Sequence, residues 1–292
     1  MKILNYGSMN IDNVYQVDHM IQPGETQMAQ NKSLFAGGKG LNQSIAIAKA
    51  GGAVYHAGVV GDDGELLMST LERGGVDTRY IKRNAGPSGH TVIQVDKNGQ
   101  NSIIVFAGEN MRVLEEDIAK VLEGFEKGDI LILQNELDNS PTIMRMASER
   151  GMNIVFNPSP INDGLYTYPL DCVNWFLMNE IEGKALTGET EPEKILKGMK
   201  EKYPNANVVL TLGSDGAYCM NGDQILFQPS FKVKAVDTTA AGDTFTGYFI
   251  TGISNGEDLA YVMKRAAKAS SITVSRQGAA DSIPLANEVV VD

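Results

Sequence analysis

The stretch DILILQNELDNSPTIMRMASERGMNIVFN, residues 129–157, contains a strand, a helix and a second strand in that order. Residues 129–134 and 153–157 are short apolar runs, typical of strands that are buried on both faces. Between them, residues 140–151 carry apolar side chains three and four positions apart, which is the spacing of an amphipathic helix. A unit of this kind predicts two parallel strands joined by a crossover helix.

The same alternation of strands and helices extends over most of the chain. These criteria predict further strands at residues 1–7, 53–61, 175–179 and 207–213, and further helices at residues 64–75 and 115–128. Residues 240–254 and 256–274 predict a closing pair of helices, the first of them rich in small side chains. We therefore expect an α/β fold, a three-layer sandwich in which helices cover both faces of a mainly parallel central sheet.

Two stretches depart from this pattern. Residues 89–108 have the pattern of two alternating strands around a Lys97-Asn98-Gly99 turn, which is typical of a hairpin. Residues 14–37 are polar and strand-like, and Pro23-Gly24 interrupts them. Because neither stretch suits a buried parallel strand, we expect a small β-sheet beside the main one, placed as a lid.

Length and composition restrict the class of protein. We expect a single domain over residues 1–292, with lid segments at about 10–36 and 86–108. The 36 acidic and 25 basic residues give a net charge of −11, which is the opposite of what a nucleic-acid partner requires. Residues 1–18 lack the apolar stretch of a signal peptide, and no segment approaches the ~20 apolar residues of a membrane span. We therefore expect a cytoplasmic protein without membrane contact.

Cysteine and histidine give no metal or redox signal. Cys172 and Cys219 each lie in an apolar run, and two distant cysteines make neither a disulfide framework nor a zinc site. His19, His56 and His90 lack the spacing of metal ligands, so we expect no chemical role for them.

The strongest motif is VDTTAAGDTF, residues 236–245, where a turn of small residues leads directly into a helix. Unpaired amides of Ala241, Gly242 and Asp243 would face outward there, and the start of a helix stabilises an anion. Asp243 could instead be a helix cap. A cap does not require Ala-Ala-Gly before it, whereas small residues let a bulky anion approach the backbone, so the pattern favours a functional role.

A second motif, AGGKGLNQS at residues 36–44, also joins a strand to a helix through glycines. It is a poor dinucleotide fingerprint, which argues against a Rossmann dehydrogenase. Neither a Walker sequence nor the protein-kinase signatures occur in the chain. Lys39 in this motif could be a surface cation.

Polar residues also follow several of the predicted buried strands. Asn10 and Asp12 could be turn residues, but two polar groups leaving a buried strand favour binding of a ligand. Glu136 could bind a ligand or be a solvated strand end, and local chemistry favours a helix cap for Asn179.

Together, the motifs at 36–44 and 237–245 resemble the two signatures of the ribokinase family of carbohydrate kinases. Smaller matches follow in the order of that family: GSMNID at 7–12, LQNE at 133–136, FNPSP at 156–160, MNEIEGKALTG at 178–188, TLGSDGA at 211–217 and SRQGAADSIP at 275–284. The resemblance covers essentially the whole chain, and several ordered motifs are more specific than any single one.

The resemblance implies roles for the matching residues. Asp243 would accept the proton of the attacking hydroxyl, and Ala240, Ala241 and Gly242 would form an anion hole for the transferred phosphoryl group. The sugar would be bound by residues from four segments, namely Asn10, Asp12, Gly38, Lys39, Asn42, Glu136 and Asp243.

The resemblance also implies ATP, Mg²⁺ and K⁺ as cofactors. The nucleotide would be bound by Asn179, Thr211, Gly213, Gly216 and Gly242. Glu182, on the same helix face as Asn179, would organise Mg²⁺ through water. Potassium would be held by Asp237, Thr239 and Ser282 with backbone oxygens of Thr273, Arg276 and Gly278. Many members of the family carry Gly where this chain has Ala240.

Within the family, Asn10-x-Asp12 and the GGKGLNQ sequence at 37–43 favour D-ribose as the acceptor and ribose 5-phosphate as the product. Another pentose, a hexose or a nucleoside is the alternative acceptor. An alternative of a different class is a non-catalytic sugar-binding paralogue, which should have lost Asp243 or the anion hole. Because a thin sheet cannot bury an apolar face alone, we also expect a homodimer that forms through the lid.

Overall fold

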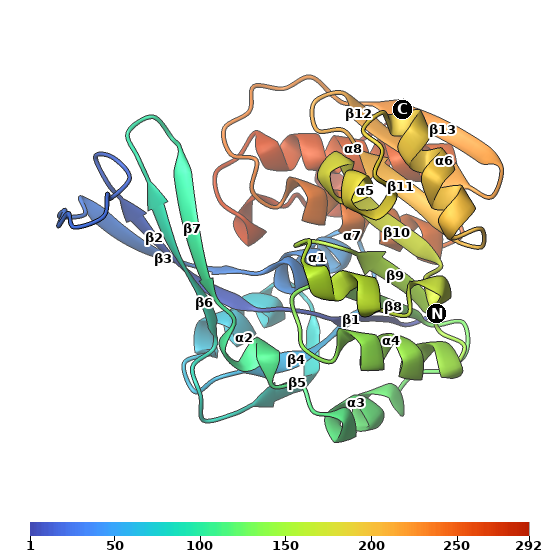
Figure 1. Cartoon of the computed structure of the whole chain (residues 1–292), viewed down its shortest axis with the longest axis horizontal. Coiled ribbons are helices and arrows are strands. Elements are labelled where there is room, and N and C mark those ends of the chain that lie inside the picture. The colour runs from blue at the N-terminus through green and yellow to red at the C-terminus, as the bar shows by residue number, and fades with distance from the viewer. Residues whose placement is uncertain (292) are drawn as a thin grey trace.

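A nine-stranded sheet forms the centre of the computed structural model, which describes residues 1–291 (Figure 1). From one edge to the other its strands are β13 (Gln224–Pro229), β12 (Gly216–Asn221), β11 (Asn207–Thr211), β10 (Trp175–Asn179), β9 (Asn153–Asn157), β8 (Ile130–Gln134), β1 (Ile3–Tyr6), β4 (Val54–Val60) and β5 (Asp77–Arg83). The strands from β11 to β5 pair in parallel, and β12 and β13 pair antiparallel at one edge. The mainly parallel sheet is therefore confirmed.

Three strands of this sheet lie outside the apolar runs that predicted strands, namely β12 and the two edge strands β5 and β13. β5 and β13 are partly exposed along their length and mix polar with apolar side chains, so neither has the pattern of a buried strand. The six apolar runs that predicted strands all form strands in the centre of the sheet.

Helices cover both faces of this sheet and complete the three layers. One core cluster holds α1 (Lys39–Lys49), α2 (Glu65–Arg73), α7 (Ala241–Ser254) and α8 (Leu259–Val274) against one face. The other holds α3 (Glu115–Leu122), α4 (Ser140–Glu149), α5 (Glu180–Thr187) and α6 (Pro192–Lys202) against the opposite face. Neighbours along a strand alternate between the clusters, as Ile132 and Leu133 do, which is why these strands are apolar throughout.

Short 3₁₀ turns complete the chain: η1 (Gly108–Met111), η2 (Asp163–Thr167), η3 (Leu170–Cys172), η4 (Ala280–Ser282) and η5 (Ala286–Glu288). Among residues 1–291, no helix is both long and apolar enough to span a membrane.

A separate four-stranded sheet projects from the side of the α/β body (Figure 1). Its strands are β3 (Asn31–Gly37), β2 (Asn10–Gln16), β6 (Gly89–Val95) and β7 (Asn101–Phe106), in that order. The outer pairs are antiparallel and the central pair, β2 with β6, is parallel. The second small sheet expected from the sequence is therefore confirmed.

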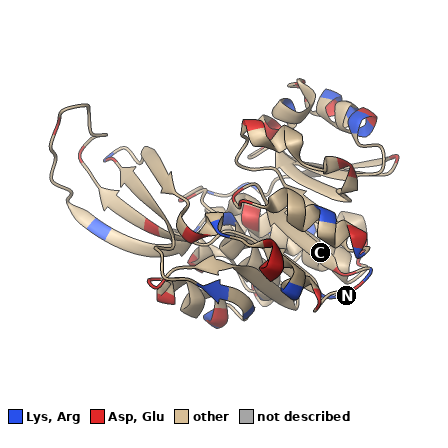
Figure 2. Cartoon of the chain, turned by 60° about the horizontal axis from the view of Figure 1, so that its bottom comes forward, with Lys and Arg blue, Asp and Glu red and all other residues tan. Residues whose placement is uncertain are grey.

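This small sheet carries little charge and leaves apolar side chains uncovered. Its four strands contain only Asp12 and Lys32 as charged residues, whereas charges of both signs cover the helices of the body (Figure 2). β7 is exposed along its whole length, with Ile104 64% and Val105 62% exposed. An exposed apolar edge strand is unusual in a monomer, because it offers a template for pairing.

The helices α1 and α7 approach each other closely. A Cβ atom at Gly247 would lie 2.3 Å from Ala46 Cβ and 2.7 Å from the Ala46 carbonyl carbon, so only glycine fits at this crossing. One turn earlier on each helix, the same contact brings Asp243 to Asn42 and Gln43.

Candidate active site

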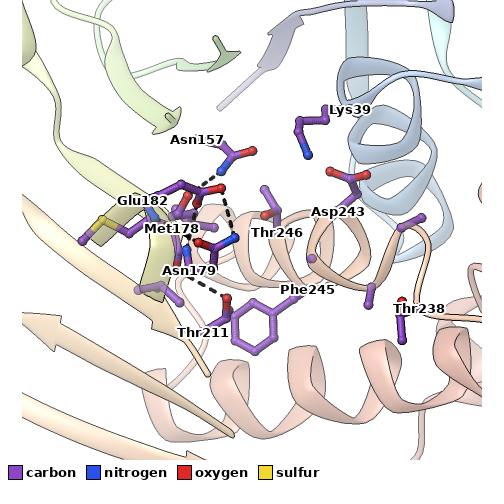
Figure 3. Close-up of a pocket in the computed structure, with 15 residues that line it drawn as sticks. Lys39, Asn157, Met178, Asn179, Glu182, Thr211, Thr238, Asp243, Phe245 and Thr246 are labelled. Carbon is purple, nitrogen blue, oxygen red and sulfur yellow. Dashed lines mark hydrogen bonds between the residues drawn. The ribbon is translucent and has the colours of Figure 1, made fainter. Parts of the chain in front are cut away.

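A cavity of about 240 Å³ opens between the carboxyl ends of β9, β10 and β11 and the first turn of α7 (Figure 3). Asn157, Asn179 and Thr211 line it from the strand ends, and Thr238 and residues 240–243 line it from the turn before α7 and its start. Ligands of parallel α/β sheets bind outside the carboxyl ends of the strands, so this cavity is the candidate active site.

The start of α7 presents backbone amides to the cavity. Ala240 is the N-cap residue, with a left-handed backbone at φ 60°, and Thr244 N donates to its carbonyl oxygen. Within the described residues, the amides of Gly242 and Asp243 have no backbone acceptor. The amide of Ala241 was expected to be unpaired as well, but it donates to Thr238 O at 3.3 Å. Two free amides at a helix start can stabilise an anion.

Asp243 is not a cap in this structure. Its carboxylate lies in the first turn of α7, makes no capping hydrogen bond and is only 9% exposed. Asn42 Nδ2 donates to its Oδ2 at 3.2 Å, and Gln43 Nε2 donates to its Oδ1 at 3.0 Å. The carboxylate is therefore held by α1 at the wall of the cavity. This excludes the alternative that Asp243 is a helix cap.

Lys39 lies beside Asp243 at the same wall (Figure 3). Burial alone would lower the pKa of Lys39, but the carboxylates of Asp243, Glu136 and Glu182 outweigh it and raise that pKa. The ammonium group is therefore charged and is positioned by acidic groups, which is not the behaviour of a solvated surface lysine.

Glu136, two residues after the end of β8, joins this group through the start of α1. Its Oε2 accepts hydrogen bonds from the hydroxyl of Ser8 and from Lys39 N, the latter at 3.3 Å. Burial raises the pKa of Glu136, and the lysine opposes that shift. The residue is only partly exposed, so a solvated strand end does not describe it.

Asn10 and Asp12 lie at the root of the small sheet. Asn10 Oδ1 accepts from Asn110 Nδ2 at 2.9 Å, and Asp12 Oδ1 accepts from Thr91 Oγ1 at 2.7 Å. Burial raises the pKa of Asp12 despite that hydrogen bond. A Cβ on Gly38 (φ 97°) would lie 3.1 Å from Asn10 N, so glycine lets the α1 motif pack against this strand.

Asn179 and Glu182 form a capping box at the start of α5. Asn179 Oδ1 accepts from the amides of Ile181 and Glu182, and Glu182 Oε2 accepts from Asn179 N at 2.8 Å. The helix cap predicted for Asn179 is thus confirmed, and both side chains also line the cavity (Figure 3). Burial raises the pKa of Glu182.

The other residues predicted to bind the nucleotide do not all lie at the cavity. Thr211 lines the cavity, whereas Gly213 and Gly216 lie outside its wall, in and just after the turn between β11 and β12. Gly216 has φ 134°, and a Cβ there would lie 2.2 Å from Gln228 O, so its packing against β13 already requires glycine.

Asp237 ties together the two loops behind the start of α7. Its Oδ1 accepts from Thr239 N at 2.9 Å and from Thr239 Oγ1 at 2.6 Å, and its Oδ2 accepts from Gly278 N at 3.0 Å. Burial would raise the pKa of Asp237, but these hydrogen bonds lower it overall, so the carboxylate stays ionised. A carboxylate is a ligand that suits an oxygen-preferring cation.

The other residues predicted to hold a cation lie at the end of α8 or in the segment that follows it. Thr273 Oγ1 contacts Thr244 Oγ1 at 3.0 Å, Ser282 donates to Ala279 O, and the side chain of Arg276 pairs with Glu288. No three His, Cys, Asp or Glu side chains within residues 1–291 are grouped so as to hold a metal ion.

Sequence reasoning did not assign a role to three residues of this region. Gln43 stands inside the second motif and contacts Asp243, and Gln134 ends β8 and contacts Gln43. Asn157 ends β9 and lines the cavity. Their signal is a polar residue at the end of a buried strand or beside Asn42, which becomes informative only when the partner is known.

Comparisons with known proteins agree on one family. The sequence model described as pfkB family carbohydrate kinase matches residues 1–286. A ribokinase of Staphylococcus aureus is 33% identical over 99% of this chain and 98% of its own length, and a deoxyribokinase of Salmonella typhi is 32% identical over 97% and 96%. A solved structure of Arabidopsis thaliana ribokinase, complexed with ribose and ATP, is 30% identical with a TM-score of 0.86, covering 99% of this chain and 97% of that one.

The left-handed backbone of Ala240 gives a first prediction. A left-handed residue with a Cβ costs about 1–2 kcal/mol, and glycine removes this cost while adding about 0.4–1 kcal/mol of freedom to the unfolded chain. Thermal unfolding of Ala240→Gly should therefore occur at or above the parental Tm, and Ala240→Val should unfold earlier. Ala241→Gly, at a right-handed helical position, is the control and should lower the Tm. An Ala240→Gly variant less stable than Ala241→Gly would contradict this account.

Proposed function

Because this chain belongs to the pfkB family of carbohydrate kinases and is therefore an ATP-dependent sugar kinase, we propose that its acceptor is D-ribose and its product ribose 5-phosphate. The observation that carries the proposal is the position of Asp243, whose carboxylate lies beside free helix-start amides and Lys39 at one cavity. The names of the relatives support a pentose, and the deoxyribokinase among them keeps 2-deoxyribose as the nearest alternative.

In the proposed reaction, Asp243 accepts the proton of the attacking hydroxyl. Two of the lone-pair positions of its carboxylate are used by Asn42 and Gln43, and the others remain for the sugar. The amides of Gly242 and Asp243 stabilise negative charge on the transferred phosphoryl group. Lys39 adds a positive charge at the same wall.

We assign the remaining residues to sugar and nucleotide by their position. Five residues at or near the start of α1 are assigned to the sugar, namely Asn10, Asp12, Gly38, Asn42 and Glu136. Asn179 and Thr211 at the strand ends bind the ATP phosphates, with Gly213 and Gly216 beyond them. Mg²⁺ would supply neutralisation of the phosphate charges, held near Asn179 and Glu182 through water. ATP is available in the cytoplasm, where we place the enzyme.

The direct test is an ATP-consumption assay with D-ribose, 2-deoxyribose, D-fructose and a panel of nucleosides. We expect the highest kcat/KM with D-ribose and phosphorylation at the 5-hydroxyl, identified by NMR of the product. A higher kcat/KM for a nucleoside or a hexose would contradict the ribose assignment. A chain that binds sugar without turnover would be the non-catalytic paralogue.

Asp243→Asn tests the assignment of the base. Asparagine is nearly isosteric but cannot accept the proton at neutral pH, so kcat should fall roughly 10²–10⁴-fold, while sugar affinity and the Tm change little. Asp258→Asn is the matched control, since Asp258 caps α8 and asparagine caps equally well. Near-parental kcat in Asp243→Asn would remove Asp243 from the mechanism.

Potassium should raise the activity, because a cation held near Asp237 would order the turn that carries the free amides of α7. Turnover in potassium chloride should exceed turnover in tetramethylammonium chloride at equal ionic strength. Asp237→Asn should weaken this difference. Equal rates in the two salts would show that the loop holds no activating cation.

We also propose that residues of about 10–36 and 86–108 act as a lid on a single domain and pair with a second lid in a homodimer. The uncovered apolar strand β7 supports this. Light scattering at micromolar concentration should give twice the mass of the 31.5 kDa chain, and Ile104→Lys should shift it toward the monomer. Ile225→Lys, at an apolar position on β13 that is also more than half exposed, should leave the dimer intact. A monomeric parent would contradict the proposal.

A further inference from the structure

A line of buried amide side chains leads from Asp243 into the α/β body. Gln43 Nε2 donates to Asp243 Oδ1 at 3.0 Å, and Gln134 Nε2 donates to Gln43 Oε1 at 2.7 Å. Gln43 and Gln134 are each 1% exposed, so water does not compete for these hydrogen bonds. Neither glutamine lines the cavity.

The direction of each hydrogen bond in this line is determined by chemistry. An ionised carboxylate only accepts, so Gln43 must turn its NH₂ group toward Asp243. Its carbonyl oxygen then faces Gln134, which must present its own NH₂ group. The second N–H of Gln134 goes to Asn5 Oδ1 at 3.0 Å.

The far end of the network is fixed independently. Asn5 Nδ2 donates to Gly40 O at 2.9 Å, and a backbone carbonyl also only accepts. Asn5 Nδ2 is 2.9 Å from Ser44 Oγ, which in turn lies 2.7 Å from His56 Nδ1. The Gly40 carbonyl oxygen therefore fixes Asn5 with its NH₂ group toward α1 and its Oδ1 toward Gln134. This is the orientation that the line of hydrogen bonds from Asp243 also requires.

His56 closes the network as a neutral side chain. It is fully buried, and burial lowers its pKa to about 4. A neutral imidazole can accept from Ser44 at Nδ1 only if its proton is on Nε2, which lies 3.2 Å from Gly7 O. Every member of the network thus has one orientation.

Gln134 has a cost that a purely structural residue need not have. Its Oε1 has no hydrogen-bond partner within the described residues, and a buried unpaired acceptor costs about 1–3 kcal/mol. An apolar side chain of the same length would avoid this cost. An apolar side chain could not, however, hold the amide of Gln43 in the orientation in which it donates to Asp243.

From this arrangement we propose that Gln43 is a positioning residue for Asp243 and that Gln134 locks Gln43 in its donating orientation. The inference rests on the proposed function, in which Asp243 is the base. Gln43 and Asn42 hold one carboxylate oxygen each, so the plane of the carboxylate is set by α1. Displacing a catalytic base by about an ångström can strongly lower the rate of the reaction, because proton transfer depends on geometry.

The test compares Gln43→Met, Gln134→Met and the double variant with the parent. Each single substitution keeps the length of the side chain and should lower kcat about 10–100-fold, while KM for ribose changes less than about threefold. Because both residues act through one contact, the double variant should be no slower than the slower single variant. Additive losses in kcat would show that Gln134 does not act through Gln43.

Thr251→Val is the matched control. Thr251 is buried in the same α1–α7 interface, two turns from Asp243, and donates to Gly247 O. Loss of the threonine hydroxyl should lower the Tm without lowering kcat. The variant therefore distinguishes an effect on stability from an effect on the position of Asp243. Gln43 and Gln134 variants with kcat equal to that of Thr251→Val, or with losses confined to KM, would overturn the inference.

Further outcomes are distinguished by the same measurements. A parent without sugar-kinase activity would refute the proposed function, whereas an active parent with unaffected glutamine variants would refute only the positioning role. If Gln43→Met does not fold, Gln43→Glu replaces it, because it keeps the acceptor for Gln134 and removes the donor to Asp243. Gln43→Glu should lower kcat by at least as much, and a parental kcat in this variant would equally overturn the inference.

Discussion

The close packing of α7 on α1 is the contact on which the site depends. It is possible because Gly247 has no side chain at the point where the backbone of Ala46 passes. One helical turn before this point, the same spacing places Asp243 within hydrogen-bonding distance of two successive residues of α1. A wider crossing would separate the proposed base from both amides and from Lys39. Packing and chemistry are therefore set by one interhelical distance.

The electrostatics of the site follow from the same packing. Three carboxylates surround a single ammonium group, so the protein side chains alone leave the site negative. An anionic phosphate donor can bind there only with help from the helix-start amides and from added cations. This explains why a chain with a net charge of −11 can still act on ATP in the proposed function. It also explains why the proposed magnesium and potassium positions flank the start of α7.

Sequence patterns predicted the buried strands because apolar residues on both faces leave an unbroken run, as Ile130–Leu133 does. They also singled out Asp243, since a carboxylate after Ala-Ala-Gly is unusual for a cap. They could not show that Ala240 takes the cap position with a left-handed backbone, which depends on the turn before it. The pairing of Gln43 with Gln134 was equally hidden, because the residues are 91 positions apart and meet only in the folded sheet.

The small sheet is attached to the body at residues that we assign to the proposed sugar site. Three residues separate the end of β1 from the start of β2 at Asn10, and only Gly38 separates the end of β3 from the start of α1. Both connections are short, so Asn10 and Gly38 lie where the sheet joins the body. A movement of the sheet would therefore displace groups of the proposed sugar site. In the proposed function, admission of the sugar and movement of the sheet are therefore mechanically coupled.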